Sequence, residues 1–186
     1  DEDGVAFITP MLPGENAIIE VDANVSGFLN AWVDFNGNGS FDSGEQIASD
    51  RPMAQGINQI TVPVPIDATG IMYSRFRFTQ DNPNGELGPS DRWNNGEVED
   101  YVLAELGDRV WLDNGSGGGS AVDGIQNGTE PGVPNAIVEL LDGSGQPVLD
   151  SGGNPVSTTT DSTGFYHFPG LVPADYQVIF TPPAGY

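Results

Sequence analysis

Short apolar runs separated by turn-forming residues make up the first half of this chain. The runs are spaced roughly ten residues apart and show no helical period, which is the pattern of an antiparallel β-sandwich. In residues 72–79, Met72, Phe76 and Phe78 share one face, and the alternate positions, Arg75 and Arg77 among them, face the other way. The strands predicted before residue 107 are Ala17–Val21, Phe28–Asp34, Ile57–Val64, Met72–Thr79 and Val98–Leu106.

The same kind of pattern restarts after Gly107, and no convincing helix is predicted in either half. We therefore predict an all-β chain of two tandem antiparallel β-sandwich domains, Ig-like or jelly-roll-like, over residues 1–106 and 107–186. Because the joint at Leu106–Gly107 is short, it is expected to be stiff. The strands predicted in the second half are Arg109–Leu112, Ala136–Leu141, Val156–Thr160, Phe165–Phe168 and Tyr176–Thr181.

The segment 34–45 matches the twelve-residue calcium loop D-x-[DN]-x-[DN]-G-x5-E at every defined position. Calcium prefers six to eight oxygen ligands in a tightly wrapped loop, and Gly39 permits the sharp turn that such wrapping needs. The alternative is an acidic, glycine-rich surface turn. The predicted ligands are the side chains of Asp34, Asn36 and Asn38, the carbonyl of Ser40, Asp42 through water, and both oxygens of Glu45.

The segments beside this loop predict strands rather than the amphipathic helices of an EF-hand. Residues 27–33 before the loop are rich in aromatic and aliphatic side chains, and residues 46–50 after it are too few for a normal helix. The loop is therefore expected to act as a structural calcium clamp rather than as a sensor that opens a helix pair.

The amino-acid composition limits which partners and cofactors this chain is expected to bind. The formal net charge is −22, with five arginines, no lysine and no cysteine. Nucleic acid is not an expected partner, because phosphate binding needs clustered cations. Without cysteine no disulfide forms, which leaves Ca²⁺ as the one strong staple and the expected cofactor. A secreted chain in calcium-rich medium and a chain adapted to high salt both remain open.

No apolar run of 18 residues exists, so no membrane insertion is predicted. No nucleophile motif and no phosphate-binding loop stand out, and the single histidine, His167, is expected to be a packing or surface residue. We therefore predict no catalytic residues and no enzymatic activity.

The long polar segment 81–96 is a second candidate functional region, because loops of this length are often ligand-ordered. One interpretation of the acidic residues that follow it is a ladder in which Glu97 and Glu99 face the arginines of 72–79. The other is a third calcium site that uses Asp91 and Asp100, joined by residues 1–3. Trp93 in this loop is the candidate for stacking on a glycan, whereas Trp32 and Trp111 fall in strand patterns and are expected in the core.

The first half resembles the GEVED domain of secreted bacterial proteins. The resemblance is carried by Gly96-Glu97-Val98-Glu99-Asp100-Tyr101, by residues 31–39 and by 74–77, and it covers roughly residues 1–106. It implies an extracellular β-sandwich in large modular surface proteins and no established catalytic activity.

The second half is similar to the B-type repeat of the serine–aspartate repeat (Sdr) surface adhesins, through residues 107–113, 123–133, 159–166 and 180–186. That resemblance implies a calcium-stabilised sandwich whose loop reads D-x-N-x-D-G-x-x-D-x-x-E. Six extra residues separate the first two aspartates here. The resemblance also implies further strands after Tyr186, so that the second sandwich is expected to be truncated or completed by a neighbouring strand. The implied ligands of this second site are Asp113, Asp123, Ile125, Asn127 and Glu130.

Together these features predict a calcium-stabilised stalk segment of a large secreted bacterial protein of the cell surface or extracellular matrix, such as an adhesin or fibre component. The expected partners are neighbouring domains of the same polypeptide or other copies, through strand donation or fibre assembly. The alternative is a carbohydrate or surface-ligand binding module that uses the 81–96 loop.

Overall fold

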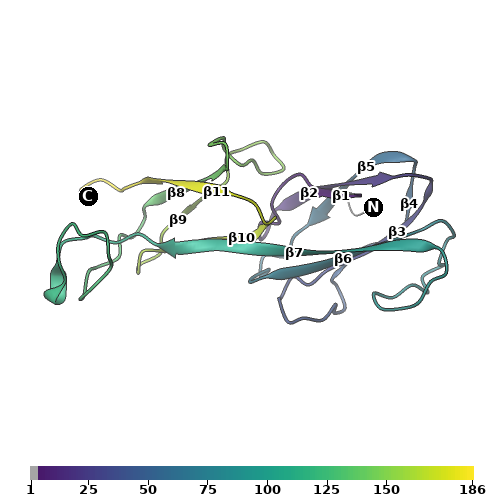
Figure 1. The fold of residues 1–186 in the computed structure, drawn as a ribbon, viewed down its shortest axis with the longest axis horizontal. Coiled ribbons are helices and arrows are strands. Elements are labelled where there is room, and N and C mark those ends of the chain that lie inside the picture. The colour runs from purple at the N-terminus through teal and green to yellow at the C-terminus, as the bar shows by residue number, and fades with distance from the viewer. Residues whose placement is uncertain (1–3) are drawn as a thin grey trace. The chain divides into compact units, whose positions relative to one another are not determined.

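The computed structural model describes residues 4–186, and this part of the chain is all-β, as predicted, with no α-helix (Figure 1). Its one helical element is a single 3-10 turn, Ser116–Gly118. The strands are β1 Val5–Phe7, β2 Asn16–Ala23, β3 Gly27–Val33, β4 Gln46–Met53, β5 Gly56–Pro63, β6 Met72–Thr79, β7 Gly96–Arg109, β8 Ile137–Asp142, β9 Ser157–Thr159, β10 Phe165–Leu171 and β11 Tyr176–Thr181.

The chain forms two compact units, and the first takes the described residues up to Glu105 together with 150–152 and 169–173. The strands of its two sheets lie in the orders β1-β2-β5 and β7-β6-β3-β4, and the two sheets face each other as two layers (Figure 1). The core lies between them. Ile19 and Ile60 come from one sheet, Leu29 and Phe76 from the other, and all four are at most 2% exposed.

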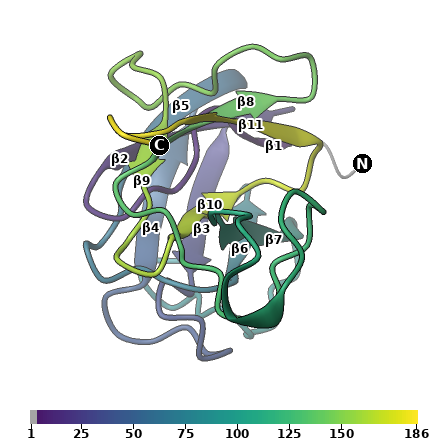
Figure 2. The same ribbon diagram turned by 90° about the vertical axis from the view of Figure 1, so that its left-hand side faces the viewer.

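The second unit takes residues 106–149, 153–168 and 174–186. Strands β11 and β9 both pair antiparallel with β8, and β11 lies beside β8 in Figure 2. Buried side chains of this unit include Val138, Leu140 and Phe168. Tyr166 packs edge-on against Phe168.

The strand predictions are largely confirmed, with three differences. Strand β6 has the predicted bounds, but β1 was missed because its sequence lacks a clear alternation of apolar and polar residues, and β4, expected at residues 46–50 beside the calcium loop, runs on to Met53. The short strand predicted at Arg109–Leu112 is wrong. Strand β7 instead runs on to Arg109, and Trp111 makes only a single bridge to Gly132.

Candidate calcium sites and the arginine-anchored loop

The loop predicted to bind calcium connects β3 and β4. Asp34 follows the last residue of β3, and Glu45 precedes the first residue of β4. Because these strands pair antiparallel, the two ends of the loop meet, and the Val33 amide donates to the Glu45 carbonyl at 2.9 Å. Within the loop, Phe41 packs against the buried Trp32 with ring centroids 6.4 Å apart. Sheet pairing and this aromatic contact therefore fix the loop at its ends and its middle.

Asp34 is a buried carboxylate that organises the first half of the loop. Asp34 is only 1% exposed. Its carboxylate accepts hydrogen bonds from the backbone amides of Asn38 at 3.1 Å and Gly39 at 2.7 Å. Gly39 has a φ of 82°, a left-handed conformation that glycine adopts without steric cost. The sharp turn expected from the motif is therefore present.

Glu45 closes the loop from its other end. This carboxylate is also buried, at 6% exposure, and it accepts from the Phe35 amide at 3.0 Å and the Asp42 amide at 2.7 Å. Asp34 and Glu45 therefore lie beneath one short loop, held by backbone amides rather than by a cationic side chain. The amide donors offset part of the cost of burying two negative charges.

The three remaining side-chain ligands of the motif converge on the same place. The side-chain nitrogen Nδ2 of Asn36 lies 3.0 Å from Glu45 Oε1 and 3.4 Å from Asp42 Oδ2. The side-chain nitrogen Nδ2 of Asn38 lies 2.7 Å from Asp42 Oδ2. A rotation of 180° about the Cβ–Cγ bond of either asparagine exchanges Nδ2 for Oδ1, so that the side-chain oxygen faces the carboxylates. The donor set then becomes all-oxygen, which is the chemistry that calcium prefers.

These residues fit calcium only as a mixed set. Within residues 4–186, no three carboxylate, imidazole or thiolate groups gather closely enough to hold a metal by themselves. A cation in this loop would depend on the amide oxygens of Asn36 and Asn38 and on the Ser40 carbonyl as well as on the carboxylates. Such a set of few charges is typical of weak extracellular calcium modules.

The second predicted site repeats this architecture in the second unit. Asp113 accepts from the Val122 amide at 2.5 Å and the Gly124 amide at 2.8 Å, as Asp34 accepts from two amides of its loop. Glu130 is 6% exposed and accepts from the Gly115 amide at 2.8 Å and the Asn127 amide at 3.1 Å. The first and last carboxylates of both loops therefore accept from loop amides in the same way, although Asp34 is buried and Asp113 is only partly buried.

The six extra residues of the second loop leave and rejoin it at one point. Asn114 and Ala121 form an antiparallel bridge at the base of a protrusion of residues 115–120, which also contacts the rest of the loop: the Ser116 carbonyl accepts from the Thr129 amide at 2.9 Å, and the Ser120 amide donates to Asn127 Oδ1 at 3.1 Å. Counting without these six, the loop from Asp113 to Glu130 has twelve residues, the length of the first loop. Asp123 accepts from the Asn127 side chain at 3.0 Å, and Ile125 is 63% exposed, so that its backbone carbonyl is the group it would offer.

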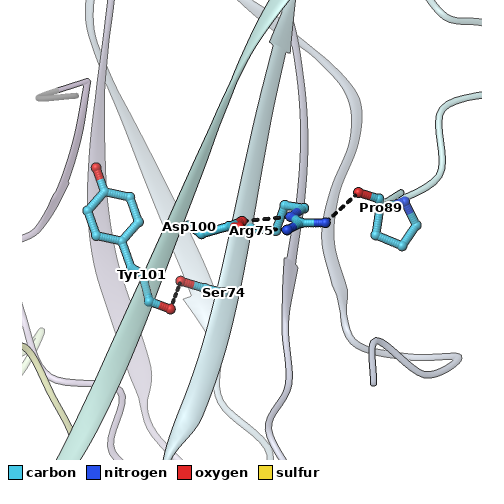
Figure 3. Close-up of polar contacts among 5 residues, drawn as sticks. All are labelled: Ser74, Arg75, Pro89, Asp100 and Tyr101. Carbon is cyan, nitrogen blue, oxygen red and sulfur yellow. Dashed lines mark hydrogen bonds and ion pairs between the residues drawn. The ribbon is translucent and has the colours of Figure 1, made fainter. Parts of the chain in front are cut away.

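The structure does not bring the predicted third site together. Asp100 is held by Arg75, with Nε to Oδ1 at 2.6 Å and Nη2 to Oδ2 at 2.5 Å (Figure 3). Asp91 instead accepts from the Gly88 amide at 2.6 Å, within its own loop. Residues 1–3, the other predicted contributors, lie outside the described residues.

The predicted Arg–Glu ladder is wrong by one residue of register. Strands β6 and β7 do pair, but Arg75 lies opposite Asp100 and Arg77 lies opposite Val98. Glu97 and Glu99 instead lie opposite Phe78 and Phe76, on the other face of the sheet. A one-residue shift moves every side chain of a strand to the opposite face, and sequence alone did not fix this register.

Both arginines of β6 hold the 81–96 loop through its backbone. Arg75 donates Nη1 to the Pro89 carbonyl at 3.1 Å (Figure 3), and Arg77 donates Nη1 to the Gly88 carbonyl at 2.6 Å. The hydrogen bond that Arg75 donates to Asp100 raises the pKa of Arg75, whereas burial lowers the pKa of Arg77, which is only 5% exposed. In the sequence, the two arginines of residues 72–79 directly before the long 81–96 segment were the one sign that arginine side chains hold this loop.

The aromatic candidates divide as follows. Trp32 is buried, as predicted, whereas Trp111 is only partly buried. Trp93 is partly buried in the loop and lines a hollow together with Arg92 and the two following asparagines. His167 is exposed and stacks on Phe165 with ring centroids 5.9 Å apart.

Comparison with known families finds two domain profiles, one after the other along the chain. The sequence profile of the GEVED domain matches residues 28–104, and that of the SdrD B-like domain matches residues 104–186. The chain joins a GEVED domain to an SdrD B-like domain. Asp34–Glu45 and the Arg75–Asp100 pair lie in the GEVED domain, and Asp113–Glu130 lies in the SdrD B-like domain.

Relatives of this chain include proteins of Staphylococcus aureus that are much longer than it. Serine-aspartate repeat-containing protein C of strain N315 is 32% identical over 138 residues, which are 70% of this chain and 12% of that protein. Bone sialoprotein-binding protein of strain MRSA252 is 40% identical over 81 residues, 44% of this chain and 6% of that protein. The chain therefore spans about an eighth or less of these relatives.

Among solved structures, the major pilin subunit BcpA of Bacillus cereus aligns with this chain at a TM-score of 0.32 and 13% sequence identity. The alignment covers 93% of this chain and 55% of the pilin chain. That likeness is too low to support an argument.

The two domains and their relatives indicate an extracellular location at the cell surface. They support a structural segment of a cell-surface adhesin, and neither profile is that of an enzyme family. The described residues contain no helix long and apolar enough to cross a membrane.

Proposed function

We propose that this GEVED–SdrD B-like pair is a calcium-stabilised stalk segment of a large bacterial surface protein, such as an adhesin or fibre component. The observation that carries the proposal is the repeated loop architecture. Asp34 and Glu45 in one unit, and Asp113 and Glu130 in the other, are acidic groups held by loop amides around a set of oxygen-bearing side chains. A hard cation is the partner that such a set would bind best.

Charge supplies the energetic reason. With a formal net charge of −22, the folded chain repels itself, and bound cations would lower that repulsion. We expect dissociation constants on the order of 10⁻⁴–10⁻³ M, as in extracellular calcium modules. At a calcium concentration 100-fold above the dissociation constant, binding to the folded state alone would add roughly 2.7 kcal/mol per site.

The test is thermal unfolding in low-ionic-strength buffer containing EDTA, CaCl₂ or MgCl₂. We expect calcium to raise the melting temperature in a saturable way, with magnesium weaker because it demands stricter geometry. NaCl matched in ionic strength controls for screening of self-repulsion. An equal rise with NaCl would reject specific calcium stabilisation.

The partners that we propose are adjoining domains of the same polypeptide or other copies of it. Strand β11 pairs with β8 on one side, and it carries the half-exposed side chains Ile179 and Phe180. An edge strand of this kind can accept a further strand from a neighbour. Sedimentation at several concentrations tests this, because strand donation between copies would give concentration-dependent association.

A second candidate function, glycan binding through the 81–96 loop, is favoured by one observation. Trp93 lines a hollow with Asn94 and Asn95, which combines an aromatic face with amide groups. A glycan array with the wild-type chain and with Trp93→Ala tests it. Binding that is lost in the variant would support this candidate, and no binding by the wild type would reject it.

A further inference from the structure

Strand β7 begins with a break in the usual pattern of apolar residues facing inward. Leu103, fully buried, marks the face that packs into the core, and alternation places Tyr101, Glu99 and Glu97 on that same face. Figure 3 shows the Tyr101 and Asp100 side chains leaving β7 on opposite sides. Two carboxylates therefore lie on the inner face of the sheet.

The opposite face of the same strand carries the residues expected inside. Val98 and Val102 are 53% and 45% exposed, so that apolar side chains face solvent, while the partly buried Glu99 and the exposed Glu97 lie on the core-facing side of the strand. A local violation of the inside–outside pattern is expected at functional sites, because stability alone would select the reverse arrangement.

A pocket opens where the inner-face glutamates lie. Its lining includes Val21 of β2, Leu29 of β3 and Phe76 of β6, each at most 4% exposed, and these form an apolar floor between the two sheets of the first unit. Glu97 and Glu99 line the same pocket, and no arginine is among the lining residues. The pocket therefore combines an apolar floor with two carboxylates and no arginine among the described residues that line it.

A hydrogen bond holds the Glu99 side chain in place, and a close backbone approach fixes the strand end that carries Glu97. The Tyr101 hydroxyl donates to Glu99 Oε2 at 2.5 Å, and the Tyr101 ring packs edge-on against Phe76 at 5.9 Å. At Gly96 an added Cβ would lie 2.3 Å from the Phe78 carbonyl oxygen, so that the backbone approach which starts β7 requires glycine. Both glutamates are thus presented by a preorganised strand end.

We propose that this pocket binds a basic side chain of a partner polypeptide, with its aliphatic stem on the Leu29–Phe76 floor and its cation beside Glu97 and Glu99. Lysine and arginine both have an apolar stem and a charged head, and such side chains bury the stem while the head stays at a wet rim. These 186 residues contain no lysine, so a lysine that fills the pocket must come from outside this sequence. The proposal does not depend on calcium binding.

The experiment is NMR titration of the ¹⁵N-labelled chain with the peptide acetyl-Gly-Lys-Gly-amide. We expect saturable shifts of the Gly4 and Gly96 amides, since both residues line the pocket. The norleucine peptide, which keeps the stem and lacks the charge, should bind at least about fivefold more weakly. The arginine peptide is expected to shift the same amides.

Matched variants separate a pocket from general attraction to an acidic protein. Glu97→Gln with Glu99→Gln is expected to weaken lysine-peptide binding roughly tenfold. Glu105→Gln removes an exposed charge further along the same strand, outside the pocket, and is expected to change affinity less than twofold. Thermal unfolding verifies that each variant is folded, and Glu97→Gln alone serves if the double variant is not. Equal loss in Glu105→Gln, equal binding of the norleucine peptide, or unshifted Gly4 and Gly96 amides would overturn the proposal.

Discussion

Arg75 and Asp100 face each other across β6 and β7 and are joined by two hydrogen bonds, at 2.6 Å and 2.5 Å. The same guanidinium also donates to the Pro89 carbonyl at 3.1 Å. One side chain therefore connects two neighbouring strands with the long loop that joins them. Because the planar guanidinium presents several donors in a fixed fork, it can hold a carboxylate and a carbonyl together.

Replacing Arg75 by Gln is expected to loosen the 81–96 loop more than it destabilises the fold. The Arg75 and Asp100 side chains are 29% and 54% exposed, so the pair should contribute no more than about 1 kcal/mol to unfolding. Limited trypsin digestion should show faster cleavage after Arg92, which lies in the loop. Cleavage after Arg77, which is buried in β6, is the internal control, and equal acceleration there would point to global unfolding instead.

Glu45→Gln and Glu130→Gln are expected to act separately on the two calcium loops. Each change keeps the shape of a buried side chain and removes the charge that a bidentate calcium ligand needs. Calorimetric titration of the wild type should show two classes of site, and each variant should lose one of them. If either variant left the calcium isotherm unchanged, the corresponding loop would not be a site.

Deleting residues 115–120 should preserve the second loop. Asn114 and Ala121 are already bridged, so joining them leaves a loop of twelve residues from Asp113 to Glu130. The Glu130 carboxylate would lose the Gly115 amide and would accept from the new Ala121 amide instead. Calcium affinity in a Glu45→Gln background should change by less than about tenfold. A complete loss would mean that the protrusion contributes to the site.

Acid should weaken the second unit in part through Asp161. The hydrogen bond from the Thr163 hydroxyl, with others from the Thr163 and Phe165 amides, lowers the pKa of Asp161 below 3.8. A folded-state pKa below the unfolded value contributes stability above pH 3.8 that is lost as the pH falls through the folded value. The free energy of unfolding, measured with urea, should therefore fall less steeply between pH 5 and pH 2 in Asp161→Asn than in the wild type. Thr163→Ala should show an intermediate slope. Identical slopes would contradict this.

The sequence by itself determined the class of fold and the first candidate site. Alternation of apolar and polar residues predicted β6 at its observed bounds, and the spacing of ligands from Asp34 to Glu45 predicted a loop that the structure closes between β3 and β4. Both signals are local, because a strand's two faces and a loop's ligand spacing are fixed within about twelve residues.

What only the tertiary structure decided was the pairing between distant segments. The register of β6 against β7 placed Arg75 opposite Asp100 and turned Glu97 and Glu99 inward, and the 81–96 loop folded over Arg77 and buried it. No local pattern carries this information, because a register shift of one residue costs little in either strand alone and changes the environment of every side chain once the sheets pack.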